Sequence, residues 1–279
     1  MKNAMQLKAI VKNISKQKKI SAQLVLQNYM LERLLERISL SKYRDNFILK
    51  GGFLIASIVG LDTRATMDMD VTIKGELVTE ENIKAIFDEV ILMPLDDGIT
   101  FEFKTISEIR EGDDYTGYRV HLTGNFPPMS VPLKLDITTG DKITPKEVQY
   151  EYRTMMDDRL ISVLAYNLET VMAEKLEAIL SRGDQTTRPR DYYDVYILWK
   201  LQGANINLEH LSQALTATAN KRGALEIMKA YQRTIDVVKS SDFMHEQWQM
   251  YQRSFDYAKE IEFNETCNAV LEVMDKLSL

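Results

Sequence analysis

The chain has 279 residues, 45% hydrophobic and 27% charged, which is typical of a folded globular protein and unlike a disordered one. Its net charge of −6 argues against a surface coated in basic residues for non-specific nucleic-acid binding, while leaving room for one basic groove. Cys267 is the only cysteine, which excludes an intramolecular disulfide, and with three scattered histidines it does not make a usual zinc site.

The N-terminal segment MKNAMQLKAIVKNISKQKK has no long apolar core followed by a small-residue cleavage site. No apolar run reaches the roughly 18 residues that are needed to span a bilayer. We therefore expect a cytoplasmic protein that has no membrane association.

The predicted elements divide the chain into three parts. Residues 1–45 are predicted to be helical, with Ser21 as an N-cap and apolar residues at helical spacing after it. Residues 46–160 mix strands and helices, and residues 161–279 read as helical. The expected fold is a mixed α/β (α+β) sheet core, on which the N-terminal helices pack, followed by a helical C-terminal domain.

Within the middle part, short strand patterns alternate with helical ones. FILK and MDVTI are strand-like, FLIASIV reads as the start of a buried helix, and TEENIKAIFDEVI has Thr79 as a candidate N-cap. The segments ITFEF, YRVHL and VPLKLDI then alternate with period two. From about Asn167, NLETVMAEKLEAIL and DYYDVYILWKL predict two helices, and weaker amphipathic patterns follow.

Asp68 and Asp70 are two residues apart at the start of a predicted strand, so both carboxylates face one side. Two such groups can bind Mg²⁺ or Mn²⁺, as in phosphoryl-transfer sites. In VPLKLDI the apolar residues take one face, which leaves Lys134 and Asp136 together on the other. Asp136 would complete a triad of metal-binding acids, whereas a solvated strand face is the alternative for each acid taken alone.

The glycine pair Gly51-Gly52 follows a predicted strand and opens a predicted helix. Without side chains, the backbone can approach a phosphate at the helix N-terminus. A tight strand-to-helix turn that binds nothing is the alternative.

Lys175 occupies the apolar stripe of its predicted helix, and Arg182 lies seven residues further on over the same face. A snorkelling lysine is one interpretation, and a cation that binds triphosphate is the other. Asp191 and Asp194 share a face of the next helix, and dipole compensation in the first turn accounts for Asp191 alone.

These residues resemble four motifs of the AbiEii-type nucleotidyltransferases, the toxins of AbiE abortive-infection toxin–antitoxin pairs, which are related to MenT-like nucleotidyltransferases. FILKGGFLIASIVGLDTRATMDMDV resembles the first motif, although Phe53 stands where a small hydroxyl residue is usual. LKLD resembles the second motif, EKLEAILSR the third and RPRDYYDVYIL the fourth. The four segments follow the family's order and span residues 47–198.

The resemblance implies a nucleotidyltransferase fold and two-metal transfer of a nucleotide from NTP, with Mg²⁺ or Mn²⁺ as cofactor. It implies metal ligation by Asp68, Asp70 and Asp136, and catalytic roles for these acids and for Lys175, Asp191 and Asp194. The implied nucleotide-binding residues are Gly51, Gly52, Arg64, Thr66, Lys134, Lys175, Arg182 and Arg190.

The acceptor expected from the resemblance is RNA, with tRNA favoured, and the expected partner is an AbiEi-like antitoxin. An acidic protein that acts on RNA must confine its positive charge to one zone, and Arg182, Arg188 and Arg190 are the candidates. The Lys16, Lys18, Lys19 cluster is a second option, although a solvated helix end is the simpler interpretation.

Three alternatives remain open. A haloacid-dehalogenase-type phosphatase also carries Asp-x-Asp, but it needs an apolar strand directly upstream, where this chain has TRATM. A small-molecule nucleotidyltransferase of the antibiotic-modifying type would share the motifs around Asp68. A catalytically silent binding module of the same fold is the third, and the intact set of three acids argues against it.

Overall fold

The computed structural model describes residues 3–109 and 117–278, and the chain forms two compact units. The first comprises residues 1–141 and 148–165, and the second comprises residues 142–147 and 166–279. Within the described part of the chain, no helix has the length and apolar character that crossing a membrane requires.

The first unit opens with the helices α1 (Ala4–Lys18) and α2 (Ala22–Leu40), as predicted. Ser21 caps α2, because its hydroxyl accepts a hydrogen bond from the Leu24 N–H at 3.1 Å. Two shorter helices follow, α3 (Gly51–Val59) and α4 (Glu80–Val90), and Thr79 caps α4 in the same way.

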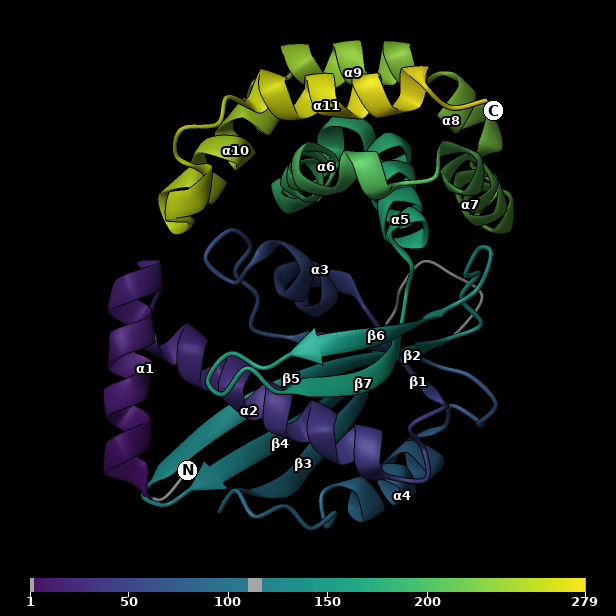
Figure 1. Cartoon of the computed structure of the whole chain (residues 1–279). Helices are drawn as coiled ribbons and strands as arrows, with labels where there is room; N and C mark the ends of the chain where they lie inside the picture. Colours follow the sequence, from purple (N-terminus) through teal and green to yellow (C-terminus); the bar gives the residue numbers. More distant parts are fainter. Residues whose placement is uncertain (1–2, 110–116, 279) are drawn as a thin grey trace. The chain divides into compact units, whose positions relative to one another are not determined.

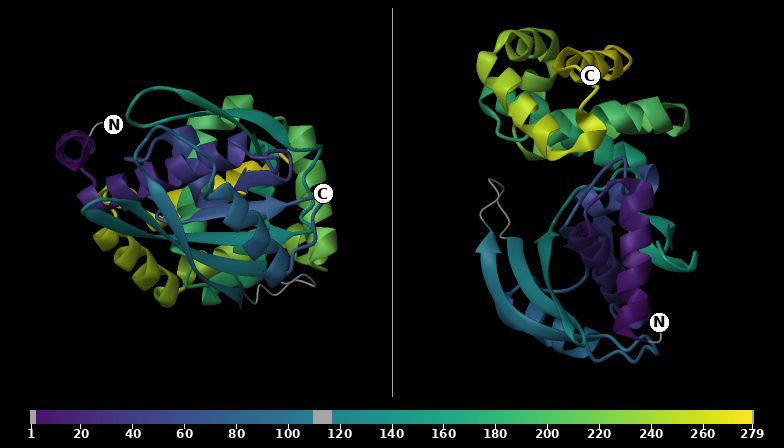
Figure 2. Two further views of the ribbon diagram at one scale, coloured as in Figure 1. Left: turned by 90° about the horizontal axis from the view of Figure 1, so that it is seen from below. Right: turned by 90° about the vertical axis from the view of Figure 1, so that its left-hand side faces the viewer.

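A mixed seven-stranded sheet forms the rest of this unit, with the order β3-β4-β5-β2-β1-β7-β6. Strand β2 is parallel to β5 and antiparallel to β1, while β1 is parallel to β7. The two long strands β3 and β4 are visibly curved in Figure 2. The strand bounds are β1 Phe47–Lys50, β2 Met69–Ile73, β3 Thr100–Ile109, β4 Gly117–Phe126, β5 Met129–Thr139, β6 Val148–Arg153 and β7 Leu160–Ala165.

The two faces of the central strands differ in character. On β5, Leu133, Leu135 and Ile137 are at most 1% exposed, so the alternation predicted from VPLKLDI is confirmed. Helix α2 covers this apolar face, since it packs against β5 and β7 (Figure 1). Helix α4 contacts the same face, where Phe87 meets Phe47 edge-to-face at 6.0 Å. The opposite face carries Lys134 and Asp136.

The hairpin β6–β7 was not predicted, and the expectation that residues 161–279 are helical is wrong for residues 161–165, which belong to β7. Strand β6 lies at the edge of the sheet, and its residues are mostly exposed apart from the buried Tyr152. An edge strand that buries little apolar surface gives only a weak alternation pattern in the sequence.

The second unit is helical, as predicted from residue 167 onward (Figure 1). Asn167 caps α5 by accepting a hydrogen bond from the Thr170 N–H at 2.7 Å, and Pro189 stands in the first turn of α6. The elements are α5 Leu168–Arg182, η1 Gly183–Gln185, α6 Pro189–Gln202, η2 Gly203–Asn205, α7 Leu208–Lys221, α8 Leu225–Lys229, α9 Tyr231–Ser240, α10 Asp242–Ser254, η3 Asp256–Ala258 and α11 Phe263–Asp275.

Candidate active site

The three predicted acids share one face of the sheet. Asp70 on β2 and Asp136 on β5 are direct Cα partners in the parallel ladder, so their side chains project to the same side. Asp68 precedes β2, and its carboxylate meets Lys134 at 2.6 Å, which places it on the Lys134–Asp136 face. The sheet therefore places Asp68, Asp70 and Asp136 on one face, in agreement with the side predicted for each strand, while their convergence on one ion stays a prediction.

The glycine pair lies against Asp70. Gly51 has a φ of +64°, and a Cβ added there would stand 2.1 Å from the Asp70 Oδ2. The Gly52 N–H donates a hydrogen bond to that same oxygen at 3.2 Å. In this structure, Gly51 and Gly52 make room for Asp70 and orient it, and their predicted contact with phosphate stays a prediction.

Arg64 and Thr66 pack beside the same glycine pair. A Cβ on Gly52 would lie 3.0 Å from the Thr66 Oγ1 and 3.2 Å from the Arg64 Nη2. Arg64 is buried, and its Nη1 donates to the carbonyl oxygen of Ala65. Phe53 is also buried and stacks on Tyr152 at 5.3 Å, so this departure from the family pattern serves as a core residue.

Helix α2 holds the segment that leads into Asp68. The Asn28 Nδ2 donates to the carbonyl oxygen of Thr66 at 2.7 Å, and the Gln27 Nε2 donates to that of Met67 at 2.9 Å. Both donors belong to buried residues and the hydrogen bonds are part-buried, so they constrain the backbone path before Asp68. The sequence gives no signal for this role, because Gln27 and Asn28 lie 40 and 38 residues away from their acceptors.

Cations from the same chain compensate the acids on this face. Arg119 on β4 is the Cα partner of Asp136 and donates two hydrogen bonds to it, each 2.8 Å long. Hydrogen bonding to Asp136, together with the negative charges of Asp136, Asp68 and Asp70, raises the pKa of Arg119. Sequence analysis missed Arg119, because the alternation of YRVHL gives its face and not its partner across the sheet.

Lys50 lies on β1 opposite Asp70 in the ladder. Its Nζ binds Asp141 at 2.7 Å, and both side chains are nearly buried. Sequence analysis missed this pair too, since the two residues are 91 positions apart.

The donor set fits a hard divalent cation, because three carboxylates from neighbouring positions share one face and such ions prefer oxygen ligands. Among residues 3–109 and 117–278, however, no three acidic, histidine or cysteine side chains are arranged to hold an ion. Two of the three acids are instead engaged in ion pairs, Asp68 with Lys134 and Asp136 with Arg119. Metal binding at these acids stays a prediction.

In the second unit, Lys175 of α5 binds both predicted acids of α6. Its Nζ lies 2.6 Å from the Asp191 Oδ1 and 3.0 Å from the Asp194 Oδ2. Asp191 and Asp194 are buried, with 2% and 0% exposure, so their shared helix face predicted from the i, i+3 spacing is confirmed. Lys175 is therefore neither a snorkelling surface lysine nor a cation without an acidic partner.

Two arginines surround the same acids. The Arg188 Nε lies 3.0 Å and the Arg182 Nη1 lies 3.7 Å from the Asp191 Oδ2. Burial alone would raise the pKa of Asp191, but the charges of Lys175 and Arg188 outweigh it and the pKa is lowered. Arg190, the fourth predicted cation, is exposed. The cluster thus holds three cations around two buried carboxylates.

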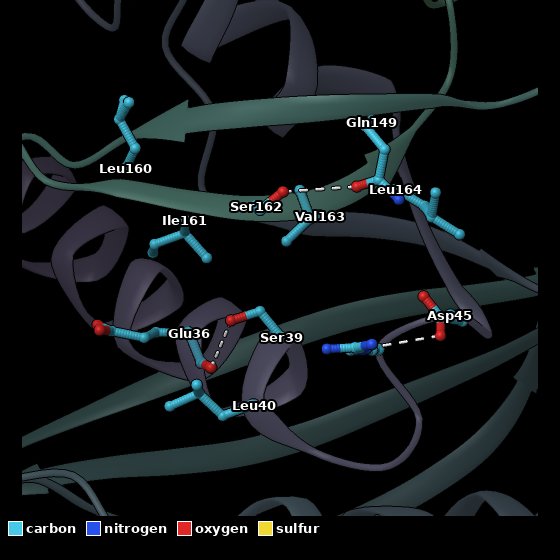
Figure 3. Close-up of a pocket in the computed structure, with 11 residues that line it drawn as sticks. Glu36, Ser39, Leu40, Asp45, Gln149, Leu160, Ile161, Ser162, Val163 and Leu164 are labelled. Carbon is cyan, nitrogen blue, oxygen red and sulfur yellow. Dashed lines mark hydrogen bonds and ion pairs between the residues drawn. The ribbon is translucent and has the colours of Figure 1, made fainter.

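A cavity of about 410 Å³ lies elsewhere in the first unit. It is lined by Glu36, Ser39 and Leu40 of α2 and by β7 residues that include Ile161 and Val163 (Figure 3). None of the predicted site residues lines this cavity, so it does not belong to the candidate active site.

Comparison with solved structures shows the fold. A crystal structure of a candidate nucleotidyltransferase from H. pylori matches with a TM-score of 0.51 and 17% identity, covering 92% of this chain and 97% of that one. The protein JHP933 from Helicobacter pylori matches with a TM-score of 0.49 and 18% identity, covering 92% and 94% of the two chains. A comparison with curated proteins gave no match.

Comparison with protein families identifies the chain more closely. A model described as the nucleotidyl transferase AbiEii toxin of a type IV toxin–antitoxin system matches residues 33–272. This range takes in every motif residue discussed above, from Gly51 to Asp194, and most of both units. The chain therefore belongs to the AbiEii nucleotidyltransferase toxin family.

Proposed function

We propose that the protein transfers a nucleotide from NTP to RNA, with tRNA as the favoured acceptor, and that this activity makes it toxic. The observation that supports it most is the pairing of Asp70 with Asp136 across β2 and β5, with Asp68 on the same face. In the proposed reaction, an acceptor hydroxyl oxygen bonds to the α-phosphorus, and the bond from that phosphorus to the bridging oxygen breaks. Pyrophosphate leaves, and the hydroxyl proton passes to solvent.

Asp68, Asp70 and Asp136 would hold Mg²⁺ or Mn²⁺, which when bound neutralises charge on the phosphates. The chain's own residues orient these ligands. The Gly52 N–H binds Asp70, and the hydrogen bonds from Gln27 and Asn28 fix the backbone that leads into Asp68. The proposal also includes the roles that the motif resemblance implies. Asp191 and Asp194 are proposed to be catalytic. The proposed nucleotide-binding residues are Gly51, Gly52, Arg64, Thr66, Lys134, Lys175, Arg182 and Arg190.

The test is incubation of the purified protein with total cellular RNA, Mg²⁺ or Mn²⁺, and NTPs labelled on the α-phosphate. We expect label in the RNA fraction, and none when the label is on the γ-phosphate, because that phosphate leaves with pyrophosphate. Asp70→Asn should abolish labelling while the melting temperature is retained, since its carboxylate is part-buried on the polar face and not in the core. Label from γ-phosphate would indicate a kinase and contradict the proposal.

The two remaining candidates give different results in the same assay. A small-molecule nucleotidyltransferase would leave the α-label in the low-molecular-weight fraction when a cell extract replaces RNA. A silent binding module would label nothing. In cells, expression without the AbiEi-like antitoxin that we propose as partner should arrest growth, and Asp70→Asn should relieve the arrest. If Asp70→Asn were as toxic as the wild type, toxicity would not depend on nucleotidyl transfer.

A further inference from the structure

Arg119 engages both oxygens of Asp136. Its Nε donates to the Oδ1 and its Nη2 to the Oδ2, each at 2.8 Å. The two residues are Cα partners in the antiparallel β4–β5 ladder, so the strands themselves hold the guanidinium and the carboxylate side by side. A two-point contact of this kind fixes the orientation of the carboxylate as well as neutralising it.

The contact with Arg119 disfavours the binding of a metal cation to Asp136. Each oxygen that accepts from Arg119 has fewer lone pairs left for a metal ion. The guanidinium also carries a positive charge that is present at every relevant pH, and it repels a second cation nearby. The Arg119 side chain is 34% exposed and that of Asp136 is 17% exposed, so solvent screens this repulsion only in part.

Asp70 has a different environment. Its Oδ2 accepts a hydrogen bond from the backbone N–H of Gly52, which carries no net charge. Asp68 pairs with Lys134, whose flexible ammonium makes a point contact at 2.6 Å. Of these three contacts, the one at Asp136 is the two-point contact with a rigid, permanently charged group.

We propose that Arg119 is a positioning residue that holds Asp136 in one orientation and competes with the divalent ion for that carboxylate. The inference rests on the proposed function, because it takes Asp136 as a metal ligand. Its consequence is that Arg119 sets the metal concentration at which the site fills.

The test measures Mn²⁺ binding to the full-length protein by electron paramagnetic resonance of the free ion, without NTP or RNA. Arg119→Gln should bind Mn²⁺ on the order of tenfold more tightly than the wild type. The substitution removes one positive charge and replaces the two-point guanidinium contact with Asp136 by a weaker, neutral donor. Arg119→Lys keeps the charge and loses the two-point contact, so its affinity should fall between the two. Arg153→Gln is the matched control, since Arg153 pairs with Asp158 at 3.4 Å on the exposed edge strand β6, and it should bind as the wild type does.

Each outcome decides a separate point. If the wild type binds Mn²⁺ and Arg119→Gln binds it equally or less tightly, the competition is overturned while the metal site stands. If none of these proteins binds Mn²⁺, the metal site is wrong and the inference falls with it. If Arg119→Gln does not fold, as judged by circular dichroism, Arg119→Lys decides: tighter binding than the wild type supports the inference, and equal or weaker binding overturns it.

Discussion

At the scale of single residues, Gly51 is held by two constraints at once. Its φ of +64° suits glycine, and the space that a Cβ would need is taken by the Asp70 carboxylate, 2.1 Å away. In Gly51→Ala the Asp70 carboxylate has to move, and a displacement of about 1 Å can reduce activity on the order of a hundredfold. Nucleotidyl transfer and the free energy of unfolding would both be measured.

Gly223 provides the matched control for Gly51. It has the same φ of +64°, and nothing lies within 4 Å of the position that a Cβ would take. Gly223→Ala should therefore lose roughly 1–2 kcal/mol of stability from backbone strain alone and keep its activity. Equal activity of the two variants would show that the position of Asp70 does not depend on Gly51.

Lys175 has an observed role in pairing with two buried acids, so its proposed contact with triphosphate has to be tested together with stability. Lys175→Ala would leave Asp191 and Asp194 buried without the cation that binds both. We expect it to lower the free energy of unfolding of the second unit by about 3–5 kcal/mol. Lys229→Ala removes an exposed pair with Glu226 and should cost at most about 1 kcal/mol.

Urea unfolding followed by tryptophan fluorescence measures this difference, because Trp199 and Trp248 both belong to the second unit. A loss of activity in Lys175→Ala supports a contact with triphosphate only under conditions in which the variant is folded. An unchanged unfolding midpoint would mean that Asp191 and Asp194 do not depend on Lys175.

At the scale of elements, helix α2 holds the backbone before Asp68 through hydrogen bonds from its buried polar side chains. Asn28→Ala removes the side-chain donor to the carbonyl oxygen of Thr66, and loss of this part-buried hydrogen bond should cost about 1 kcal/mol. We also expect nucleotidyl transfer to fall, because the backbone before Asp68 loses one of its two side-chain tethers to α2. Activity and melting temperature would be compared.

Asn82 offers a control of the same residue type on α4. Its Nδ2 donates to the carbonyl oxygen of Leu77 at 2.7 Å, but this hydrogen bond is exposed. Asn82→Ala should change stability by no more than about 0.5 kcal/mol and leave activity intact. Full activity of Asn28→Ala would show that the segment before Asp68 keeps its path without α2.

The elements also show what the sequence predicts well. The helices of residues 1–45, the strand β2 and the polar face of β5 follow from local spacing, because periodicity depends only on neighbouring residues. Local spacing also singled out the acids and Lys175, and the resemblance added the roles expected of them. Sequence reasoning missed Arg119, Lys50 and Gln27, since each acts through a partner 17 to 91 residues away whose position the sheet register or the helix packing decides.

At the scale of the whole molecule, the two units should respond to pH in opposite ways. Burial raises the pKa of Glu32, in the first unit, to about 8 from an ordinary value of 4.5. The native state then keeps a proton that the unfolded state loses, so this contribution to stability is present below pH 4.5 and is lost as the pH rises toward 8. The pKa of Asp191, in the second unit, is lowered from 3.8, so its contribution is present above that value and is lost as the pH falls through the lowered pKa.

Unfolding in urea at several pH values, followed by fluorescence and by circular dichroism, tests this expectation. Fluorescence should report a second unit that weakens toward acid pH, and circular dichroism should report an additional loss in the first unit as the pH rises from 5 to 8. Glu32→Gln should reduce the pH dependence of the free energy of unfolding of the first unit by up to about 1.4 kcal/mol per pH unit, because the titrating group is gone. Profiles that stay parallel for Glu32→Gln and the wild type would contradict the role of Glu32.

The ladder between β2 and β5 has a consequence for changes in chain length. Asp70 faces Asp136 only while the register holds, and one residue removed from β5 before Asp136 would exchange the two faces of the strand. The carboxylate would then enter the apolar layer under α2, and Leu135 would face solvent. A substitution on β5 changes one side chain, so its effect depends on that position alone. A deletion or insertion there changes the face of every residue that follows it in the strand. A one-residue insertion in the turn at Gly223, which no ladder constrains, should therefore cost less activity than one in β5.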